Sequence, residues 1–271
     1  MNTNRELMEE NRAHWDEAAS IHPATEFYDV PAFKRGETHL DDLVMSQIGD
    51  VAGQSVLHLQ CHFGMDTIRF ARLGATVIGV DFSPVAIQTA RDLAAELGVE
   101  TRFIESNIYD LPDVLDEPFD LVFTSYGVIG WLPDIKGWAQ VVARYVKPGG
   151  RFVIIEALPA AWPLDDERDD GLHIRYPYFW QPEPLTSEYE GGTYAAEGVE
   201  ITNKRTHNWN HPLGDIITAL INVGLTIEHV GEYDYCAWRA VPIMAKGDDG
   251  WWRLPPEYPA LPFLFSLRAS R

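Results

Sequence analysis

The sequence is short of cysteine and of basic residues, and each shortage argues against a class of protein. Only two of its 271 residues are cysteines, Cys61 and Cys236, which argues against a disulfide framework and a cysteine-based metal cluster. Lysine and arginine together number 21 against 41 aspartates and glutamates, giving a formal charge of −20. Because such a chain repels polyanions, nucleic acids and anionic membrane surfaces are poor partners. The acidity either serves solubility alone or favours neutral or cationic small molecules as ligands.

Long apolar runs are also missing. No run approaches the roughly 18 apolar residues of a membrane span, and the polar N-terminal stretch resembles neither a secretory signal nor a transit peptide. We therefore expect a cytoplasmic protein. The sequence predicts no metal site, and it gives no oligomeric state.

The stretch Ser55–Pro84 predicts the unit around which the chain is organised. Two apolar runs, 56–59 and 77–80, predict buried strands, and the segment between them carries the apolar stripe of an amphipathic helix. The first loop ends at Gly64 and the second strand ends at Asp81. In an open α/β sheet, a nucleotide-like ligand docks at the loop that follows such a strand.

Strands and helices alternate from this unit as far as Glu156, which predicts a doubly wound, mostly parallel sheet. Aromatic and polar residues then alternate, which predicts an antiparallel excursion with strands at 174–176, 188–194 and 199–206. A further helix and a last antiparallel strand, 263–269, complete the sheet. We therefore divide the chain into an N-terminal helical lid (1–50), a ligand-binding core (51–156), a β-rich excursion that forms an acceptor pocket (157–210) and the remainder of the core fold (211–271).

The order of these features resembles that of the class I S-adenosylmethionine-dependent methyltransferases. A loop ending at Gly64, an acid at Asp81, a polar loop after the third strand, a polar end to the fourth strand and the Pro-Gly-Gly turn at 148–150 follow one another in that order. The resemblance covers residues 56–156 well, and the loop LQCHFGMDT at 59–67 resembles that of a bacterial branch of this superfamily. It implies a Rossmann-like fold with S-adenosylmethionine as the cofactor.

The first loop departs from the common pattern V-L-D-L-G-C-G-T-G of this family. His58 stands in place of the acid, and Gln60 and His62 stand in place of two glycines. Glycines at these positions let backbone N–H groups approach the ligand closely, and the backbone can still do so here if the two side chains turn away. His58 lies on a buried strand, where we expect a hydrogen-bonded core histidine.

The resemblance implies donor contacts at the ends of the strands. Asp81 would accept hydrogen bonds from both ribose hydroxyls; alternatively it caps the next helix. Phe82 would cover the adenine or belong to the core, and Tyr126 would lie at the donor's amino-acid end or pack in the core. The predicted cofactor-binding residues are Trp15, Tyr28, Gln60, His62, Gly64, Asp81, Phe82, Asn107, Ile108, Ser125 and Tyr126.

Two histidines just before the helix at 212–223 are the candidates for catalysis. His207 and His211 would reach the mouth of the pocket as a general base; alternatively both are structural. Aromatic residues of the N-terminal segment, Trp15 and Tyr28 among them, resemble the lid of small-molecule methyltransferases and suit a sulfonium cation.

These features predict methyl transfer from S-adenosylmethionine to a small-molecule acceptor by in-line displacement at the sulfonium methyl. Two alternatives remain: a non-catalytic ligand-binding protein on the same fold, and a nicotinamide-dependent oxidoreductase. The second would require G-x-G-x-x-G, and the segment HFGMDT lacks two of those glycines. The acceptor and the methylated atom are not predicted.

Overall fold

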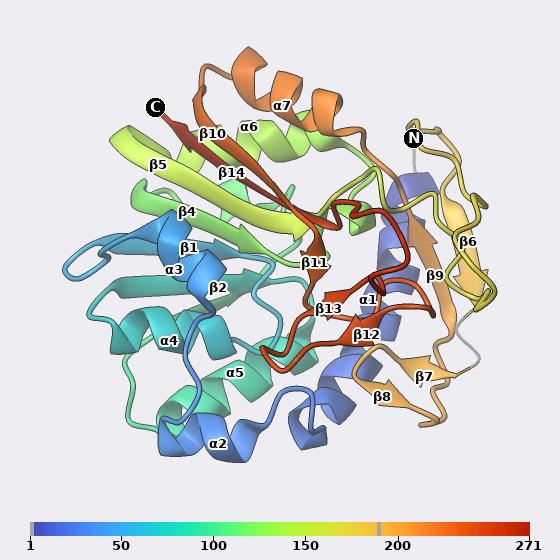
Figure 1. Ribbon diagram of the computed structural model, residues 1–271. Helices are drawn as coiled ribbons and strands as arrows, with labels where there is room; N and C mark the ends of the chain where they lie inside the picture. The colour runs from blue at the N-terminus through green and yellow to red at the C-terminus, as the bar shows by residue number, and fades with distance from the viewer. Residues whose placement is uncertain (1–2, 189–190) are drawn as a thin grey trace.

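The computed structural model describes residues 3–188 and 191–271 (Figure 1). Its helices are α1 (Thr3–Ile21), α2 (Val30–Arg35), α3 (Asp42–Ile48), α4 (Met65–Arg72), α5 (Pro84–Glu96), α6 (Ile135–Tyr145) and α7 (Leu213–Asn222), with short 3-10 turns η1 (His22–Ala24), η2 (Leu111–Asp113) and η3 (Ile129–Trp131). The central strands are β1 (Ser55–Leu59), β2 (Thr76–Asp81), β3 (Arg102–Glu105), β4 (Phe119–Ser125), β5 (Val146–Ala157), β10 (Thr226–Tyr233) and β14 (Leu264–Ser270).

The central strands form one seven-stranded sheet in the order β10-β14-β5-β4-β1-β2-β3. Strands β1 to β5 pair in parallel, whereas β14 is antiparallel to both β5 and β10. The predicted doubly wound, mostly parallel sheet with a C-terminal antiparallel strand is therefore confirmed. Because β1 to β5 run the same way, the loops that follow β1, β2, β3 and β4 meet at one edge of the sheet.

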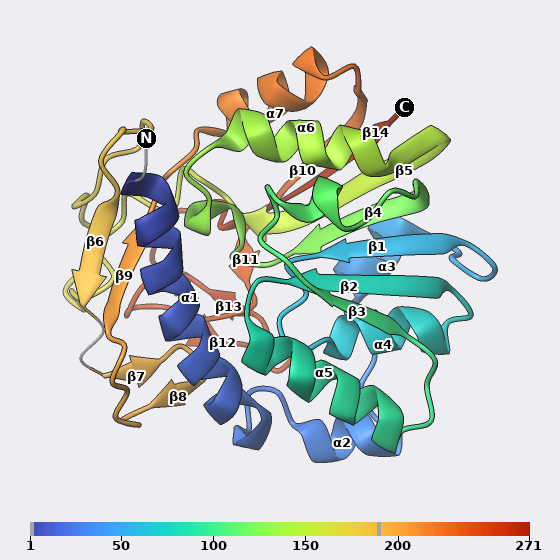
Figure 2. The same ribbon diagram turned by 180° about the vertical axis from the view of Figure 1, so that it is seen from behind.

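Both faces of the sheet are covered, as the alternation of side chains along its strands requires. Along β1, Val56 belongs to the apolar cluster that includes α3, whereas Leu57 belongs to the cluster that includes α6 and α7. Figures 1 and 2, seen from opposite sides, show α3 over one face and α6 over the other, and the apolar residues of α4 and α5 pack together with Phe103 of β3. No helix of the described residues is long and apolar enough to cross a membrane.

Small β elements lie beyond β5: the pairs β6–β9 and β7–β8 belong to the excursion, and the group β11-β13-β12 lies between β10 and β14 in the chain. Their bounds are β6 (Leu185–Glu188), β7 (Gly192–Thr193), β8 (Ala196–Glu197), β9 (Arg205–Asn208), β11 (Tyr235–Cys236), β12 (Ala245–Lys246) and β13 (Trp252–Arg253). The antiparallel character is as predicted, but the strands are shorter and displaced. The segment predicted at 174–176 contributes only an isolated bridge between Leu164 and Ile174, and Tyr189 and Glu190 of the segment predicted at 188–194 lie outside the described residues.

Helix α1 lies between the excursion and the core (Figure 2). The Asn11 side chain donates a hydrogen bond to the His207 carbonyl and accepts one from the His207 N–H, both at 2.8 Å. On its other side, Asp16 Oδ1 accepts a hydrogen bond from Ser83 Oγ at 2.6 Å, at the start of α5. The N-terminal helix therefore ties the excursion to the carboxyl edge of the sheet.

Candidate active site

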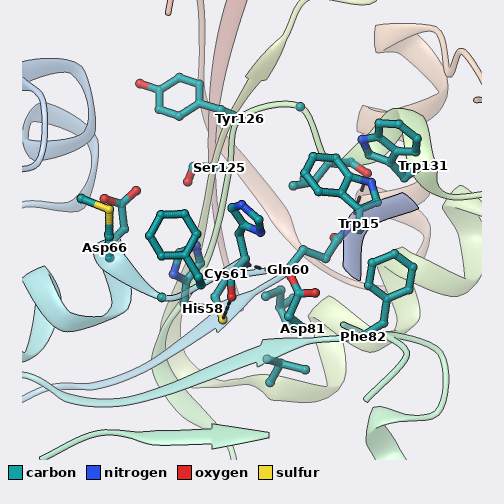
Figure 3. Close-up of a pocket in the computed structure, with 18 of the residues that line it drawn as sticks. Trp15, His58, Gln60, Cys61, Asp66, Asp81, Phe82, Ser125, Tyr126 and Trp131 are labelled. Carbon is teal, nitrogen blue, oxygen red and sulfur yellow. Dashed lines mark hydrogen bonds between the residues drawn. The ribbon is translucent and has the colours of Figure 1, made fainter. Parts of the chain in front are cut away.

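A cavity of about 480 Å³ lies at the carboxyl edge of the sheet. All the residues predicted to bind the cofactor line it, from Trp15 in α1 to Tyr126 after β4. These residues meet at one cavity because each follows a strand that ends at this edge of the sheet or lies in the N-terminal segment; their role in cofactor binding stays a prediction. Figure 3 shows two ends of the cavity: Asp81, Phe82, Trp15 and Trp131 lie on one side of the view, and Asp66, His58, Ser125 and Tyr126 lie on the other.

Asp81 ends β2 at the first of these ends. Its Oδ2 accepts the His62 N–H at 2.8 Å and its Oδ1 accepts the Ser83 N–H at 3.0 Å. The carboxylate is only 8% exposed, and burial raises its pKa to about 6 against the opposing effect of the backbone hydrogen bonds. Ser83, and not Asp81, caps α5, because its Oγ accepts the Ala86 N–H. Each carboxylate oxygen of Asp81 thus keeps a lone pair for a ligand.

The loop from β1 to α4 keeps the backbone of a glycine-rich loop although two glycines are replaced. Gln60, His62 and Gly64 all have positive φ angles, of 56°, 51° and 78°. Gln60 Nε2 donates to the Val128 carbonyl at 3.2 Å, whereas its buried Oε1 has no hydrogen-bond partner among the described residues. An orphaned acceptor in the cavity wall fits a ligand that carries an N–H or O–H donor.

Gly64 allows the loop to pack closely on its neighbours. A Cβ atom at this position would lie 2.6 Å from the Phe103 ring and 2.8 Å from the Ala90 Cβ. With its positive φ as well, the position admits only glycine without rearrangement. This glycine therefore serves packing between α4, α5 and β3.

A group of side chains from three segments covers the loop from β1 to α4, which we call the donor loop after its predicted role. His22 Nδ1 shares a hydrogen bond with His62 Nε2 at 2.9 Å, and its Nε2 shares one with Thr193 Oγ1 at 2.9 Å. The hydroxyls of Tyr28 and Tyr194 are hydrogen-bonded to each other. The Trp15 ring lies 5.4 Å from the His62 ring. We call Trp15, His22, Tyr28, Thr193 and Tyr194 the cover group, because they join the N-terminal segment and the excursion above the cavity.

Burial keeps both histidines of this contact neutral. The pKa of His22 is lowered to about 4, first by burial and then by the neighbouring His14. Burial also lowers the pKa of His62 well below its usual value, and His22 adds to this effect. A hydrogen bond between two imidazoles requires that at least one of them be uncharged, so low pH opposes this contact.

Glu156, at the end of β5, is a functional candidate that sequence reasoning missed. It is 3% exposed, and its carboxylate accepts four backbone N–H groups, from Gly127 (2.6 Å), Val128 (2.6 Å), Ile129 (3.1 Å) and Ala157 (2.5 Å). Consecutive backbone N–H groups that converge on one anion form a nest. Burial raises its pKa despite these hydrogen bonds. In the sequence this residue was visible only as the acid that ends a strand.

The nest holds the loop that carries Tyr126 and Trp131 into the cavity wall. Tyr126 and Gly127 both have positive φ angles, of 36° and 75°. Their backbone is therefore held in a conformation that a non-glycine residue such as Tyr126 rarely adopts. Glu156 supplies the hydrogen bonds that fix it.

The structure does not bring His207 and His211 to the cavity. His207 is 1% exposed and shares hydrogen bonds with Thr186 Oγ1 and Glu10 Oε2, both at 2.9 Å. His211 is 2% exposed, and its Nε2 donates to the Leu132 carbonyl at 2.6 Å. Neither residue is part of the cavity lining. Their hydrogen bonds hold the excursion against α1 and the segment after β4, which is the structural alternative.

His58, expected in the core, is also a wall of the cavity. Its Nδ1 shares a hydrogen bond with Thr67 Oγ1 at 2.9 Å, and burial lowers its pKa to about 4, so the ring is neutral. The side chain is 3% exposed and yet lines the cavity. Within the described residues no group of three or more histidine, cysteine or acidic side chains is arranged to hold a metal ion.

Comparison with known proteins relates this geometry to a family. Residues 56–150 match the family model of a methyltransferase domain. A ubiquinone biosynthesis O-methyltransferase of Alkalilimnicola ehrlichii is 34% identical over 112 residues, which are 41% of this chain and 45% of that protein. The chain therefore matches about half the length of this curated relative.

Solved structures share the fold over most of the chain. An S-adenosylmethionine-dependent methyltransferase from Mesorhizobium loti has a TM-score of 0.57 with 23% identity, over 84% of this chain and 96% of that one. The glycopeptide N-methyltransferase MtfA, in complex with S-adenosylmethionine, has a TM-score of 0.54 with 16% identity, over 84% and 91% of the two chains. At these identities the likeness shows the fold.

None of these similarities supports the nicotinamide-dependent oxidoreductase or the non-catalytic binding protein. The family match spans the strands and loops that build the cavity. Residues 56–150 therefore match a methyltransferase domain in sequence, the chain shares the Rossmann-like fold of methyltransferases of known structure, and these similarities support S-adenosylmethionine as the cofactor.

Proposed function

We propose that this protein transfers a methyl group from S-adenosylmethionine to a small-molecule acceptor. The observation that carries the proposal is the cavity at the carboxyl edge of the sheet. The predicted cofactor-binding residues line it, and past Ser125 and Tyr126 it extends to Asp41 and Asp66. A volume of about 480 Å³ lies within the range of small-molecule sites. The small-molecule partner and the cytoplasmic location are part of this proposal.

The donor-binding residues offer the contacts that an adenosine with a charged amino-acid tail needs. Asp81 would accept hydrogen bonds from ribose hydroxyls, and Phe82 with Ile108 would border the adenine. Asn107 Oδ1 already accepts the Tyr109 N–H at 3.0 Å, so its second lone pair and its amide group are what it offers a ligand. Gln60 Oε1, which accepts no hydrogen bond from the described residues, would suit the ammonium group of the amino-acid tail.

S-adenosylmethionine supplies a methyl carbon that is already activated by the sulfonium. The protein's own contribution is then to hold both reactants in line and to exclude water, effects worth roughly 7–11 kcal/mol in well-oriented systems. The cover group would exclude water, because it joins α1 and η1 to the excursion by hydrogen bonds. Residues 1–50 and 157–210 would act as lid and acceptor pocket.

Titration calorimetry tests the proposal against its alternatives. S-adenosylmethionine and S-adenosylhomocysteine should bind, and NAD should not. A panel of hydroxyl, amine and thiol compounds is then screened for formation of S-adenosylhomocysteine; hydroxyl compounds are included because one relative is named an O-methyltransferase. Tight NAD binding without any response to S-adenosylhomocysteine would contradict the proposal, and binding without turnover on a broad panel would favour the non-catalytic alternative.

A further inference from the structure

The end of the cavity beyond Ser125 is rich in hydrogen-bond acceptors. We call Asp41, His58, Asp66, Arg69 and Tyr126 the acid chamber; all of them line the cavity. They come from the segment before α3, from β1, from the start of α4 and from the loop after β4. Figure 3 shows Asp66, His58 and Tyr126 on the side of the view opposite Asp81 and Phe82.

The ionic pairs leave this chamber with one uncompensated carboxylate. Arg69 Nη1 pairs with Asp66 Oδ1 at 2.5 Å, and its Nη2 donates to Thr38 Oγ1 at 2.8 Å. Asp41 has no salt bridge among the described residues. Its Oδ1 caps α3 by accepting the Val44 N–H at 2.8 Å, and its Oδ2 accepts the Tyr126 hydroxyl at 2.9 Å. Two carboxylates thus face one guanidinium, and the chamber has a formal charge of −1.

His58 provides an independent indication of a ligand. The residue is only 3% exposed, and it lines the cavity. Only Nδ1 has a hydrogen-bond partner among the described residues, Thr67 Oγ1. When Nδ1–H donates to Thr67, Nε2 presents a lone pair to the cavity. In that tautomer Nε2 can accept a hydrogen bond from a donor on a bound ligand.

We propose that the acid chamber binds a protonated amino group of the methyl acceptor, with Asp41 as its counter-ion and His58 Nε2 as a second hydrogen-bond acceptor. This rests on the proposed function, and it names the substrate class as small molecules that carry a cationic amine. An ammonium group brings three donors and one positive charge, which match the surplus acceptors and the negative charge of the chamber. Tyr126 and Trp238, which also line this end, add aromatic faces suited to a cation.

We assign the acid chamber to the methyl acceptor because the amino group of S-adenosylmethionine has another oxygen to which it can donate a hydrogen bond. Gln60 Oε1, in the loop whose His62 N–H contacts Asp81, would accept a hydrogen bond from the amino group of the methyl donor. The net charge of −20 of the whole chain acts in the same direction, since it raises the local concentration of cations.

The test compares matched probes on protein loaded with S-adenosylhomocysteine. Phenethylamine, 2-phenylethanol and 3-phenylpropanoate are titrated in turn; they share an aromatic body and differ in charge. The amine should bind about tenfold more tightly than the alcohol, and the carboxylate should bind least. Asp41→Asn should abolish the preference for the amine, and asparagine should still cap α3 because it is an equally good N-cap.

Two further measurements test whether the negative charge of the chamber is what binds the amine, and whether Asp41 contacts the methyl donor instead. Asp66→Asn leaves Arg69 uncompensated and so removes the negative charge without touching Asp41; it should also weaken the amine and spare the alcohol. Binding of S-adenosylhomocysteine and of methylthioadenosine, which lacks the amino-acid tail, is measured on Asp41→Asn. If this variant weakens the first ligand and spares the second, Asp41 serves the donor and the proposal is overturned.

Equal binding of amine and alcohol by the wild-type protein would overturn the proposal as well, and so would the absence of any amine binding. Because S-adenosylhomocysteine is titrated first, a protein that fails to bind it contradicts the proposed function itself. A protein that binds S-adenosylhomocysteine but shows no preference for the amine contradicts only the assignment of the acid chamber.

Discussion

Replacing Glu156 with glutamine changes one atom of a buried carboxylate and two of its four hydrogen bonds. Oε1 accepts the N–H groups of Gly127 and Ala157, and Oε2 accepts those of Val128 and Ile129. Whichever oxygen becomes the NH₂ group, two N–H donors lose their acceptor and face another donor.

The expected loss in the free energy of unfolding follows from these two N–H groups without an acceptor. A buried N–H group without a partner costs about 1–3 kcal/mol, which gives about 2–6 kcal/mol for the pair. The neutral amide avoids burying a charge, which offsets part of this loss, so we expect a decrease of ~3 kcal/mol in the free energy of unfolding. For a chain of this size the midpoint of thermal unfolding should fall by about 5 °C.

The loop should also lose its place in the cavity wall. We therefore expect S-adenosylhomocysteine to bind about tenfold more weakly to Glu156→Gln at a temperature where the variant is folded. Asp120→Asn is the matched control, since Asp120 accepts the Ser55 N–H at 2.9 Å, pairs with Lys147 and lies at the opposite end of β4. It should lower stability by at most about 1 kcal/mol and leave the ligand affinity unchanged. Equal ligand affinity in both variants would refute the reasoning that Glu156 positions the loop.

Three further predictions concern the donor end of the cavity. Affinity for S-adenosylhomocysteine should fall as the pH drops below about 6, where Asp81 becomes protonated. Calorimetry between pH 5 and pH 8 checks this. An affinity that does not depend on pH would contradict the role of Asp81 in binding the ribose. The folded-state pKa of His22, about 4, lies below its ordinary value of 6.5, so its stabilising contribution is complete above pH 6.5 and up to ~3 kcal/mol is lost as the pH falls towards 4. Thermal melts of wild type and His22→Phe should therefore diverge over this range, and parallel curves would argue against the histidine contact. Gly64→Ala should destabilise the protein by ~2–4 kcal/mol, because the added Cβ would clash with Phe103 and Ala90. The control Gly127→Ala, whose Cβ would meet nothing within 4 Å, should cost only ~1 kcal/mol. Equal losses of stability in the two variants would contradict the packing role of Gly64.

The strands of the core, and the place at the cavity of the residues predicted to bind the cofactor, were predictable because they depend on local signals. Apolar runs locate β1 and β2, and parallel strands bring their ends to one edge. Asp81 and Ser125 could therefore be placed together although the chain separates them by more than 40 residues. The strands of the excursion were harder to predict, because strands as short as β7 and β8 contain too few residues for an alternation of side chains to be recognised.

The contacts over the cavity were not predictable, because they join segments that are distant in the sequence. His22 meets Thr193 across 171 positions and His62 across 40, and no local pattern signals such a meeting. Glu156 was missed for a related reason: its partners are backbone N–H groups, which leave no trace in the sequence. The buried histidines His207 and His211 drew a catalytic interpretation because sequence shows residue type but not the direction of a ring.

Gln60 and His62 explain how a glycine-rich loop can be rewritten without losing its shape. A side chain in the left-handed region costs about 1–2 kcal/mol per residue, so two replaced glycines require compensation. Gln60 gains a hydrogen bond to Val128, in the loop held by Glu156, and the His62 ring gains one to His22 of the cover group. The His62 N–H still reaches Asp81, as the N–H of a glycine would. The strain is thus offset by contacts that glycine cannot make, and those contacts connect the donor loop to the loop after β4 and to the cover above it.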